Sequence, residues 1–407
     1  MRRVLRWIVV VVVVAHGLIH LLGATKGFGW ADVSQLKEPI SPGMGAAWLV
    51  AGALVVLAGV LLASGVRWWW IVGAGAVVAS QAVVLTSWTD ARAGTVANLV
   101  LAAAVVHGYA ADGPPSFRAE YQQRVEAALS VPQGSAVVTD ADLAHLPGPV
   151  AAYVRDSGAV GQPRVGSFRA RIHGRIRSGA DRAWMTFTGE QVNTYGPEPS
   201  RLFIMDATLW GLPVDVLHTD VGAAATMRVK ACSLLPMVDA AGPAMDRAET
   251  VTLFDDLCIL APAALIDAPI TWQPIDADHA RGTFSNGPHT VTAELAFNPQ
   301  HELVDVISDD RLHASPDGKT FTAQRWSTPV RDYRVIDSRR VATTGEGRWH
   351  AAPPEGVFSY LEFHLDQITY NVGTGREAGS PGPSALVTRS RGDEHQELRE
   401  ATKGSAR

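Results

Sequence analysis

The chain has 407 residues, a formal net charge of −5 and a hydrophobic fraction of 47%. This length predicts two or three domains, and the negative charge argues against a nucleic-acid-binding protein. The two cysteines, Cys232 and Cys258, lie in apolar surroundings and outside any CxxC pair. Buried structural thiols are therefore favoured over a redox or zinc role, and a single disulfide between them stays open.

Four apolar segments fill the first 111 residues. Each has close to the ~20 residues that a helix needs to cross a membrane. The segments run over 4–22, 46–66, 68–88 and 94–111. Arg2, Arg3 and Arg6 precede the first segment, and no A-x-A-like cleavage site follows it, which favours an uncleaved anchor over a signal peptide. Tryptophans at the ends of the third segment fit an aromatic belt.

Basic residues near the ends of these segments predict the orientation of the chain. One side carries Arg6, Arg67 and Arg118, and the other carries Lys26, Lys37 and Arg92. The bias predicts a multi-pass protein of the cell membrane with both termini and the soluble domain in the cytoplasm. An odd number of true spans would reverse this orientation.

Several polar residues interrupt the apolar segments. His16 and His20 are four residues apart, and hence on one helix face. With alternating helix directions, they fall in the outer half of the membrane together with Gln81 and Asn98. We expect an intramembrane polar cluster that joins the first, third and fourth helices by hydrogen bonds. A metal or proton site is the alternative, but neither a metal nor another cofactor is predicted.

Residues 112–162 are expected to form a helical connector, with one helix over 119–129 and a short helix within 143–160. Residues 163–373 show the short alternating segments of a β-rich domain, and residues 374–407 have the composition of a disordered tail. Strands are predicted over 167–178, 182–192, 201–209, 214–218, 226–231, 270–276, 280–286, 289–298, 302–311, 319–327, 330–336, 348–352 and 357–372.

One amphipathic helix interrupts the strands at 247–266. The predicted fold is thus a membrane α-helical bundle of four spans, followed by an α+β soluble domain dominated by a curved antiparallel β-sheet. A bent open sheet of this kind, with helices over its concave face, makes an apolar cavity.

The strand over 167–178 has a conspicuous basic face. Its five alternate positions are Arg169, Arg171, His173, Arg175 and Arg177. Pairing with acidic residues on a neighbouring strand is the favoured interpretation. Contact with anionic lipid headgroups at a membrane surface is the alternative.

The segments HGLIHLLG (16–23) and SWTDARAGTVAN (87–98) resemble the membrane part of an uncharacterised actinobacterial family of multi-pass membrane proteins. Residues 201–218, 247–267 and 302–311 resemble the soluble part of that family. The resemblance implies no known activity. The order of strands and helix is also similar to bacterial lipoprotein-carrier half-barrels. Those carriers work outside the cytoplasm, which conflicts with the orientation that the charges predict.

The leading hypothesis is a membrane-anchored binding module for a hydrophobic or lipid-like ligand, with the lipid bilayer as its other partner. Aromatic residues with a few polar groups are typical of small-ligand sites, although the same aromatic residues also build cores. The expected ligand-binding residues are Trp184, Phe187, Glu190, Phe203, Trp210, His218 and Arg311.

An enzyme acting on a membrane-derived substrate and a non-enzymatic partner subunit of a membrane complex are the alternatives. No catalytic residue is assigned, because the sequence holds no G-x-S-x-G, H-E-x-x-H or P-loop motif. The adjacent carboxylates Asp255 and Asp256 lie on the predicted helix, where neighbouring side chains point about 100° apart.

Overall fold

The structure is a computed structural model, and it describes residues 2–131, 136–315 and 317–373. The predicted disordered tail, 374–407, lies outside the described residues. The proposed domain boundaries at residues 111, 162 and 373 stay predictions.

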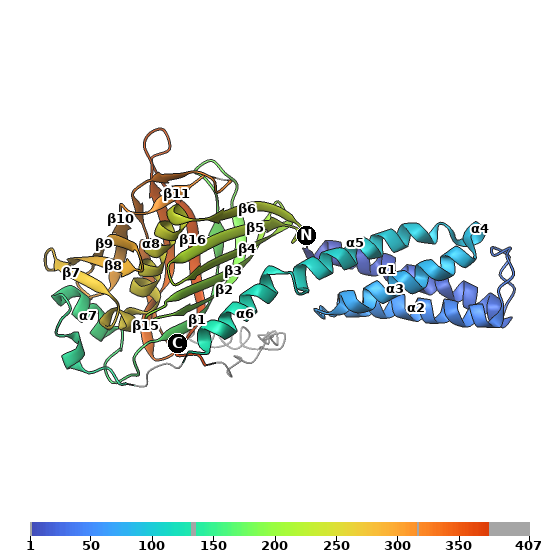
Figure 1. Ribbon diagram of the computed structural model, residues 1–407, viewed down its shortest axis with the longest axis horizontal. Helices are drawn as coiled ribbons and strands as arrows, with labels where there is room; N and C mark the ends of the chain where they lie inside the picture. Colours follow the sequence, from blue (N-terminus) through green and yellow to red (C-terminus); the bar gives the residue numbers. More distant parts are fainter. Residues whose placement is uncertain (1, 132–135, 316, 374–407) are drawn as a thin grey trace, which may run out of the picture. The chain divides into compact units, whose positions relative to one another are not determined.

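Four of the described helices are long and apolar enough to span a membrane, as the sequence predicts. We call them the apolar bundle: α1 (Arg2–Phe28), α2 (Pro42–Ala63), α3 (Trp69–Thr86) and α5 (Gly94–Asp112). A single turn, α4 (Trp88–Ala91), joins α3 to α5. Successive helices of the bundle run in opposite directions (Figure 1).

Glycines bring α1 and α2 into close contact. A Cβ atom on Gly52 would lie 2.9 Å from the carbonyl oxygen of Gly17, and one on Gly23 would lie 2.4 Å from the ring of Trp48. Small residues of this kind are how apolar helices approach one another where no hydrophobic effect drives them together. The close approach buries Trp48 against α1, with its ring 5.2 Å from that of His20.

The β-rich part contains a 14-stranded sheet with antiparallel pairing throughout. Its strand order is β6-β5-β4-β3-β2-β1-β16-β15-β13-β10-β9-β8-β7, with β14 paired to β15, and the sheet is not closed. The first six strands are β1 (Ser167–Ile176), β2 (Met185–Thr194), β3 (Ser200–Leu209), β4 (Leu212–Val221), β5 (Ala224–Ala231) and β6 (Leu235–Ala241). The remaining strands of this sheet are β7 (Ile270–Pro274), β8 (His279–Asn286), β9 (His289–Phe297), β10 (Leu303–Ser308), β13 (Trp326–Ser327), β14 (Val330–Ile336), β15 (Arg339–His350) and β16 (Val357–Tyr370).

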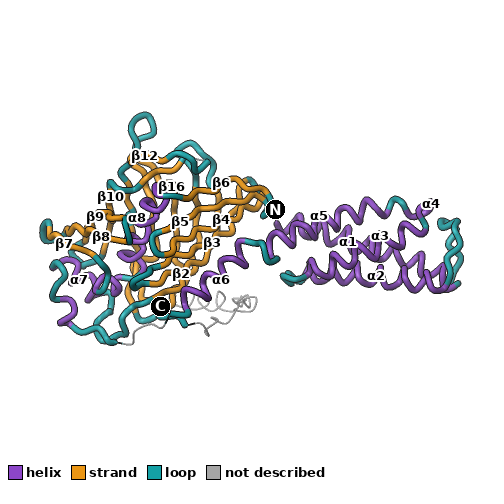
Figure 2. Tube along the Cα trace, viewed as in Figure 1, coloured by secondary structure: helices purple, strands orange, loops and turns teal. Residues whose placement is uncertain are grey.

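Helix α8 (Pro243–Leu260) fills the concave face of this sheet. It contacts β5 and β6 at one end of the strand order and β9 and β10 near the other. Two sets of strands that far apart can meet one helix only if the sheet curves around it (Figure 2). The two halves also touch at their turns, where Asn286 donates to the carbonyl oxygen of Gly222. The curved sheet is therefore confirmed, but α8 occupies the concave face on which the sequence predicts a cavity.

Apolar packing holds α8 in place. Phe254 is fully buried and stacks on Phe284 of β8 with ring centroids 5.3 Å apart. At the carboxyl end of α8, where helix carbonyls lack partners, the hydroxyl of Tyr153 donates to Cys258 O at 2.7 Å and that of Tyr370 donates to Leu260 O at 2.6 Å.

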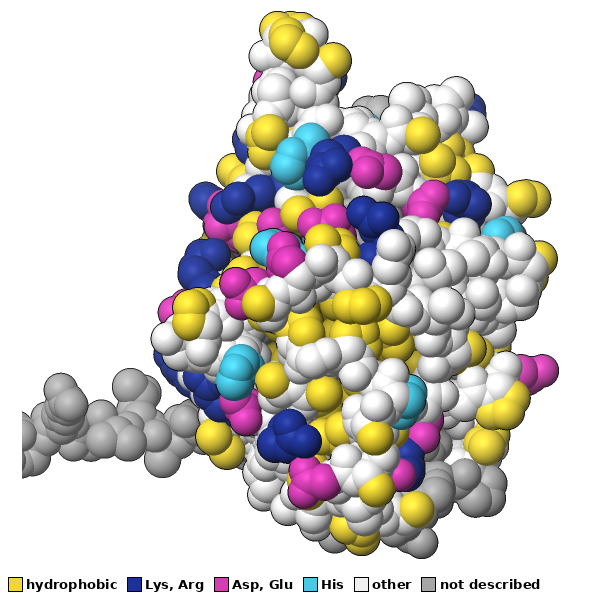
Figure 3. Space-filling view, turned by 90° about the vertical axis from the view of Figure 1, so that its left-hand side faces the viewer, with side chains coloured by type: hydrophobic (Ala, Val, Ile, Leu, Met, Phe, Trp, Pro, Cys, Tyr) yellow, Lys and Arg dark blue, Asp and Glu magenta, His cyan; other side chains and the backbone are white. Residues whose placement is uncertain are grey.

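The remaining helices cover other parts of the sheet. α6 (Phe117–Leu129) lies on the convex face against β2, β3 and β4, as Figure 1 shows. η1 (Asp140–Leu143), α7 (Gly148–Asp156) and η2 (Pro262–Ile266) share the main core with α8 and the sheet. Figure 3 views the domain from the side of β7, β8 and α7, where hydrophobic side chains gather at the centre and charged side chains surround them.

Some predicted elements differ from the observed ones. Strand β6 was not predicted, because its sequence LPMVDAA shows no clear alternation. In the small two-stranded sheet, β11 (Leu312–Ala314) was not predicted either, and β12 (Phe321–Ala323) is part of the predicted strand over 319–327. The predicted strand over 348–352 is the end of the twelve-residue strand β15. The predicted helix over 247–266 is confirmed as α8 followed by η2.

Candidate functional site

An open groove of about 520 Å³ lies in the apolar bundle. It lies between α1 on one side and α4 and the beginning of α5 on the other. Apolar side chains such as Val12, Ile19, Leu22 and Val84 form much of its lining. The small residues Ala93, Gly94 and Ala97 keep it open on the α5 side.

The floor of the groove is polar. His16 and His20 line it from α1, and a hydrogen-bond network connects them to α3 and α5. The Nε2 atoms of both rings converge on the Ser80 hydroxyl, at 3.2 Å from His16 and 2.9 Å from His20. His16 Nε2 is also 3.0 Å from Asn98 Oδ1. The network continues through Gln81, which accepts from Asn98 at 2.9 Å and donates to Thr95.

Counting donors and acceptors assigns the protons of this network. Nδ1 of His20 lies 2.9 Å from the carbonyl oxygen of His16, which only accepts, so Nδ1 carries the proton and a neutral ring accepts at Nε2. Asn98 donates to Gln81 through Nδ2, which fixes the orientation of the Asn98 amide and leaves Asn98 Oδ1 as an acceptor. Asn98 Oδ1 therefore accepts from His16 Nε2, and also from the Ser80 hydroxyl at 2.8 Å, which shares its one proton between Asn98 Oδ1 and His20 Nε2. Because a neutral His16 carries its proton on Nε2, its Nδ1 is an acceptor.

Trp48 adds a second unusual polar group to the lining. Its side chain is 4% exposed, and the indole N–H has no hydrogen-bond partner within the described part of the chain. A buried donor without a partner is rare and costs free energy. No three His, Cys, Asp or Glu side chains among the described residues lie close enough to hold a metal ion together.

The structure brings the predicted intramembrane cluster together: His16, His20, Gln81 and Asn98 are all members of the network. Ser80, which links both histidines, was missed. A serine in an apolar segment has no sequence signal of its own, and its contacts with His16, His20 and Asn98 follow only from the packing of α1, α3 and α5.

The predicted ligand-binding residues of the soluble part do not converge on one cavity. Phe187 and Phe203 are buried in the core beneath α8. Glu190 lies on the convex face, where it accepts from Tyr121 of α6. Trp184 packs under the guanidinium groups of Arg175 and Arg177, and Trp210 is 81% exposed in the turn between β3 and β4.

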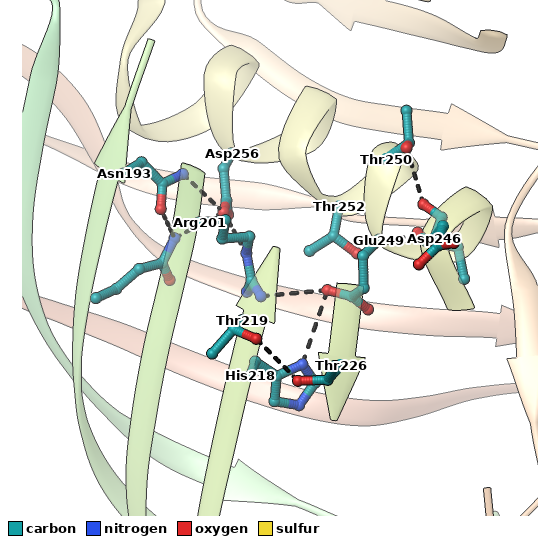
Figure 4. A network of polar contacts seen from close by, with 12 residues as sticks. Asn193, Arg201, His218, Thr219, Thr226, Asp246, Glu249, Thr250, Thr252 and Asp256 are labelled. Atoms are coloured by element: carbon teal, nitrogen blue, oxygen red, sulfur yellow. Dashed lines mark hydrogen bonds and ion pairs between the residues drawn. The ribbon is translucent and has the colours of Figure 1, made fainter. Parts of the chain in front are cut away.

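His218 and Arg311 do come together, on Glu249 of α8. The His218 Nδ1 atom is 3.7 Å from Glu249 Oε2, which is too far for a hydrogen bond, and Arg311 Nη2 is 3.4 Å from Oε1. Arg201 of β3, which the sequence did not single out, lies 3.3 Å from Glu249 and donates to Asp256 at 2.7 Å. Figure 4 shows this network between the sheet and α8.

Burial and charge shift several pKa values in this network. Burial alone would raise the pKa of Glu249, but Arg311, His218 and Arg201 hold it well below its usual range. Burial raises the pKa of Asp220 to about 8, and the nearby Glu249 adds to the shift. Burial also raises the pKa of Asp255, which faces Thr328 and Asp305. The two adjacent carboxylates of α8 thus have different partners, as their spacing predicts.

The basic face of β1 lies on the convex side of the sheet. Most of its charges have partners on neighbouring strands: Arg175 binds Glu362 with two hydrogen bonds of 2.6 and 2.7 Å, His173 lies 2.7 Å from Asp366, and Arg169 lies 4.0 Å from Glu190. Arg177 donates to the carbonyl oxygens of Ser359 and Ala180. Arg171 is exposed. This arrangement is the acidic pairing that was favoured, and lipid contact by the same strand stays a prediction.

The two cysteines are free. Cys258 is buried in α8 and Cys232 is partly exposed in the turn between β5 and β6.

Comparison with solved structures finds coarse similarity to several chains, including the following three proteins. A DUF1329 family protein from Desulfovibrio piger is 13% identical with a TM-score of 0.34, over 55% of this chain and 92% of that one. A putative outer membrane lipoprotein-sorting protein domain from Vibrio parahaemolyticus is 11% identical with a TM-score of 0.30, over 51% of this chain and 86% of that one. A LolA superfamily protein from Nitrosomonas europaea is also 11% identical with a TM-score of 0.30, over 54% of this chain and 92% of that one. The expected likeness to lipoprotein carriers exists at this level, and it carries no information about function.

No curated protein matches this sequence. A family model does match it, over residues 136–363, which contain α7, α8 and the strands of the sheet as far as the middle of β16. Because this match spans more than half of the chain, the protein belongs to DUF6544, a family of unknown function.

Proposed function

We propose that the protein is a membrane-anchored binding protein for a hydrophobic, lipid-like ligand, and that the groove of the apolar bundle is its binding site. The observation that carries this proposal is the groove of about 520 Å³, with apolar walls over a hydrogen-bonded polar floor. In the soluble part, α8 takes up the concave face, so the bundle offers the better site.

The size and chemistry of the groove fit this class of ligand. Small-molecule sites usually have volumes of about 300–1,000 Å³, with apolar walls and a few placed polar groups. An alkyl or isoprenoid chain would lie along Val12, Ile19 and Leu22 of α1. The acceptor nitrogen of His16 would take a hydrogen bond from a hydroxyl or amide of the ligand.

Membrane anchoring and orientation are part of the same proposal. The four helices have the length and hydropathy of membrane spans. Arg6 and Arg67 lie at one end of the bundle, and Lys26, Lys37 and Arg92 lie at the other, so the charge bias favours a cytoplasmic soluble domain. The groove would then open in the outer half of the membrane.

The experiment that tests the proposal fills the groove without touching its floor. Ala97→Phe adds a ring at a half-buried position of the lining, and it should displace a bound lipid. Val96→Phe is the matched control, because Val96 is the preceding residue of the same helix, is 67% exposed and lies outside the lining. Loss of the lipid in both variants, or in neither, would contradict the assignment of the groove.

A further inference from the structure

We propose that the tips of two β-hairpins of the soluble domain insert into the surface of the lipid bilayer. The tips form an exposed apolar patch, which we call the hairpin-tip patch. Its members are Trp210, Leu212, Leu234, Leu235 and Met237. Trp210 is 81% exposed, Leu235 is 62% exposed and Met237 is 60% exposed. The proposal rests on the membrane anchoring proposed above, but not on the groove.

The sheet register places these residues at one end of the sheet. The turn between β3 and β4 follows the Leu209–Leu212 pair, and the turn between β5 and β6 follows the Ala231–Leu235 pair. Because Val214 of β4 pairs with Ala231 of β5, the two turns lie side by side. Their apolar side chains therefore form one surface.

The conformation of Trp210 argues that it has a role outside the fold. It has a φ of +48° and Gly211 has a φ of +78°, so the two residues form a turn with both central φ angles positive. Such two-residue hairpin turns favour Asn-Gly and Asp-Gly, and a bulky residue with positive φ is an outlier. An exposed tryptophan in a strained turn does not stabilise the fold of the soluble domain, so its presence points to a contact outside that domain.

The chain holds this end of the sheet near the membrane. Only four residues separate the end of α5 at Asp112 from the start of α6 at Phe117, a reach of at most about 18 Å. The first turn of α6 is fixed to the patch end of the sheet: Phe117 packs against Lys230 (4.4 Å from nitrogen to ring centroid) and Arg118 forms an ion pair with Asp206 at 2.5 Å. The hairpin tips are therefore tethered close to the end of the last apolar helix.

The bilayer surface is the occupant that this chemistry fits. Tryptophan prefers the membrane–water interface, where its ring lies at the level of the headgroups. Leucine and methionine side chains gain from burial in the adjacent acyl region. An exposed patch of this kind marks a membrane or protein contact, and the tether to four candidate spans favours the membrane. A partner protein on the patch is the other outcome of the test.

The experiment uses the full chain in lipid nanodiscs, with a polarity-sensitive fluorophore on a single reactive cysteine. In a Cys232→Ser background, Leu235→Cys places the fluorophore in the patch. Val335→Cys is the control: it is 71% exposed but lies beside the turn between β14 and β15, at the opposite end of the sheet. Cys258 is fully buried and stays unlabelled.

Lipids with a quencher at the headgroup level should quench the fluorophore at position 235 and leave it bright at position 335. Adding Trp210→Asn should reduce the quenching at position 235, although Asn-Gly suits the turn better and keeps the hairpin folded. Equal emission at positions 235 and 335, in protein that remains in the nanodisc, would overturn the docking proposal while leaving the groove proposal standing. Ala97→Phe, which acts on the groove alone, should not change the quenching.

Discussion

Removing the guanidinium of Arg201 should destabilise the soluble domain far more than removing a similar group from its surface. Arg201 neutralises two carboxylates of α8, at 2.7 Å from Asp256 and 3.3 Å from Glu249. The variant Arg201→Met keeps much of the side-chain volume but leaves both carboxylates buried without their shared cation. We therefore expect α8 to lose much of its attachment to β3.

The expected magnitude follows from burial. The three side chains are only 4–12% exposed, and breaking a buried ion pair by removing one partner costs about 3–5 kcal/mol. Asp256 keeps the amides of Gln191 and Asn193, and Glu249 keeps Arg311. These remaining partners place the expected loss near the lower limit, at about 3 kcal/mol.

Urea unfolding of the full chain in detergent, followed by near-ultraviolet circular dichroism, measures this loss. Arg281→Met is the matched control, because Arg281 forms an exposed ion pair with Glu294 at 3.4 Å, and such pairs contribute about 0–1 kcal/mol. Hydrogen exchange should accelerate over α8 in Arg201→Met and not in the control. If the two variants unfold at the same urea concentration, the reasoning about the buried network is refuted.

The remaining predictions concern acidity and thiol reactivity. Asp220→Asn should stabilise the protein increasingly as the pH rises from 5 to 8. The folded-state pKa of Asp220 is about 8, so the folded wild type keeps this proton while the unfolded chain loses it above about pH 4; folding must then take up a proton, which costs no more than about 4 kcal/mol at pH 7. A pH-independent difference in urea midpoint would contradict it. Cys232 should react with iodoacetamide in the native protein while Cys258 reacts only after unfolding, because burial raises the pKa of Cys258; equal rates of alkylation would refute this.

Local patterns predicted most of the elements of this fold. The alternation of β1 is an example: Phe168, Ala170 and Ile172 are buried on the concave side, and the basic residues between them lie on the convex side. The four apolar segments are confirmed as helices because length and hydropathy are properties of each segment alone. These predictions needed no knowledge of what lies opposite each element.

The site depended on long-range pairing, which local patterns do not contain. Arg201 and Glu249 are 48 residues apart, and His16 and Asn98 are 82 residues apart. The sequence predicted that the polar residues of the first, third and fourth apolar segments would cluster, because helix direction and depth could be inferred. A helix over the concave face of the sheet was predicted, but no comparable depth rule applies to a curved sheet. The filling of the expected cavity by α8 and the position of Arg201 beneath it were therefore not foreseen.

Trp210 illustrates a different limit. From the sequence alone, Trp210 is predicted to line an apolar cavity, because aromatic side chains usually line such sites. The structure places it at the tip of a hairpin, where the register of β3 and β4 leaves it in solvent. The role that we assign to Trp210 therefore changes from contact with a ligand to contact with the membrane surface.

The mass of the intact chain tests most directly the claim that the groove of the apolar bundle binds a lipid-like ligand. Full-length protein, released from its membrane in mild detergent, should carry one lipid-sized adduct per chain by native mass spectrometry. The adduct should persist in Val96→Phe and disappear in Ala97→Phe, because only the second substitution fills the groove. A wild-type chain without an adduct, or an adduct that survives Ala97→Phe, would contradict the account.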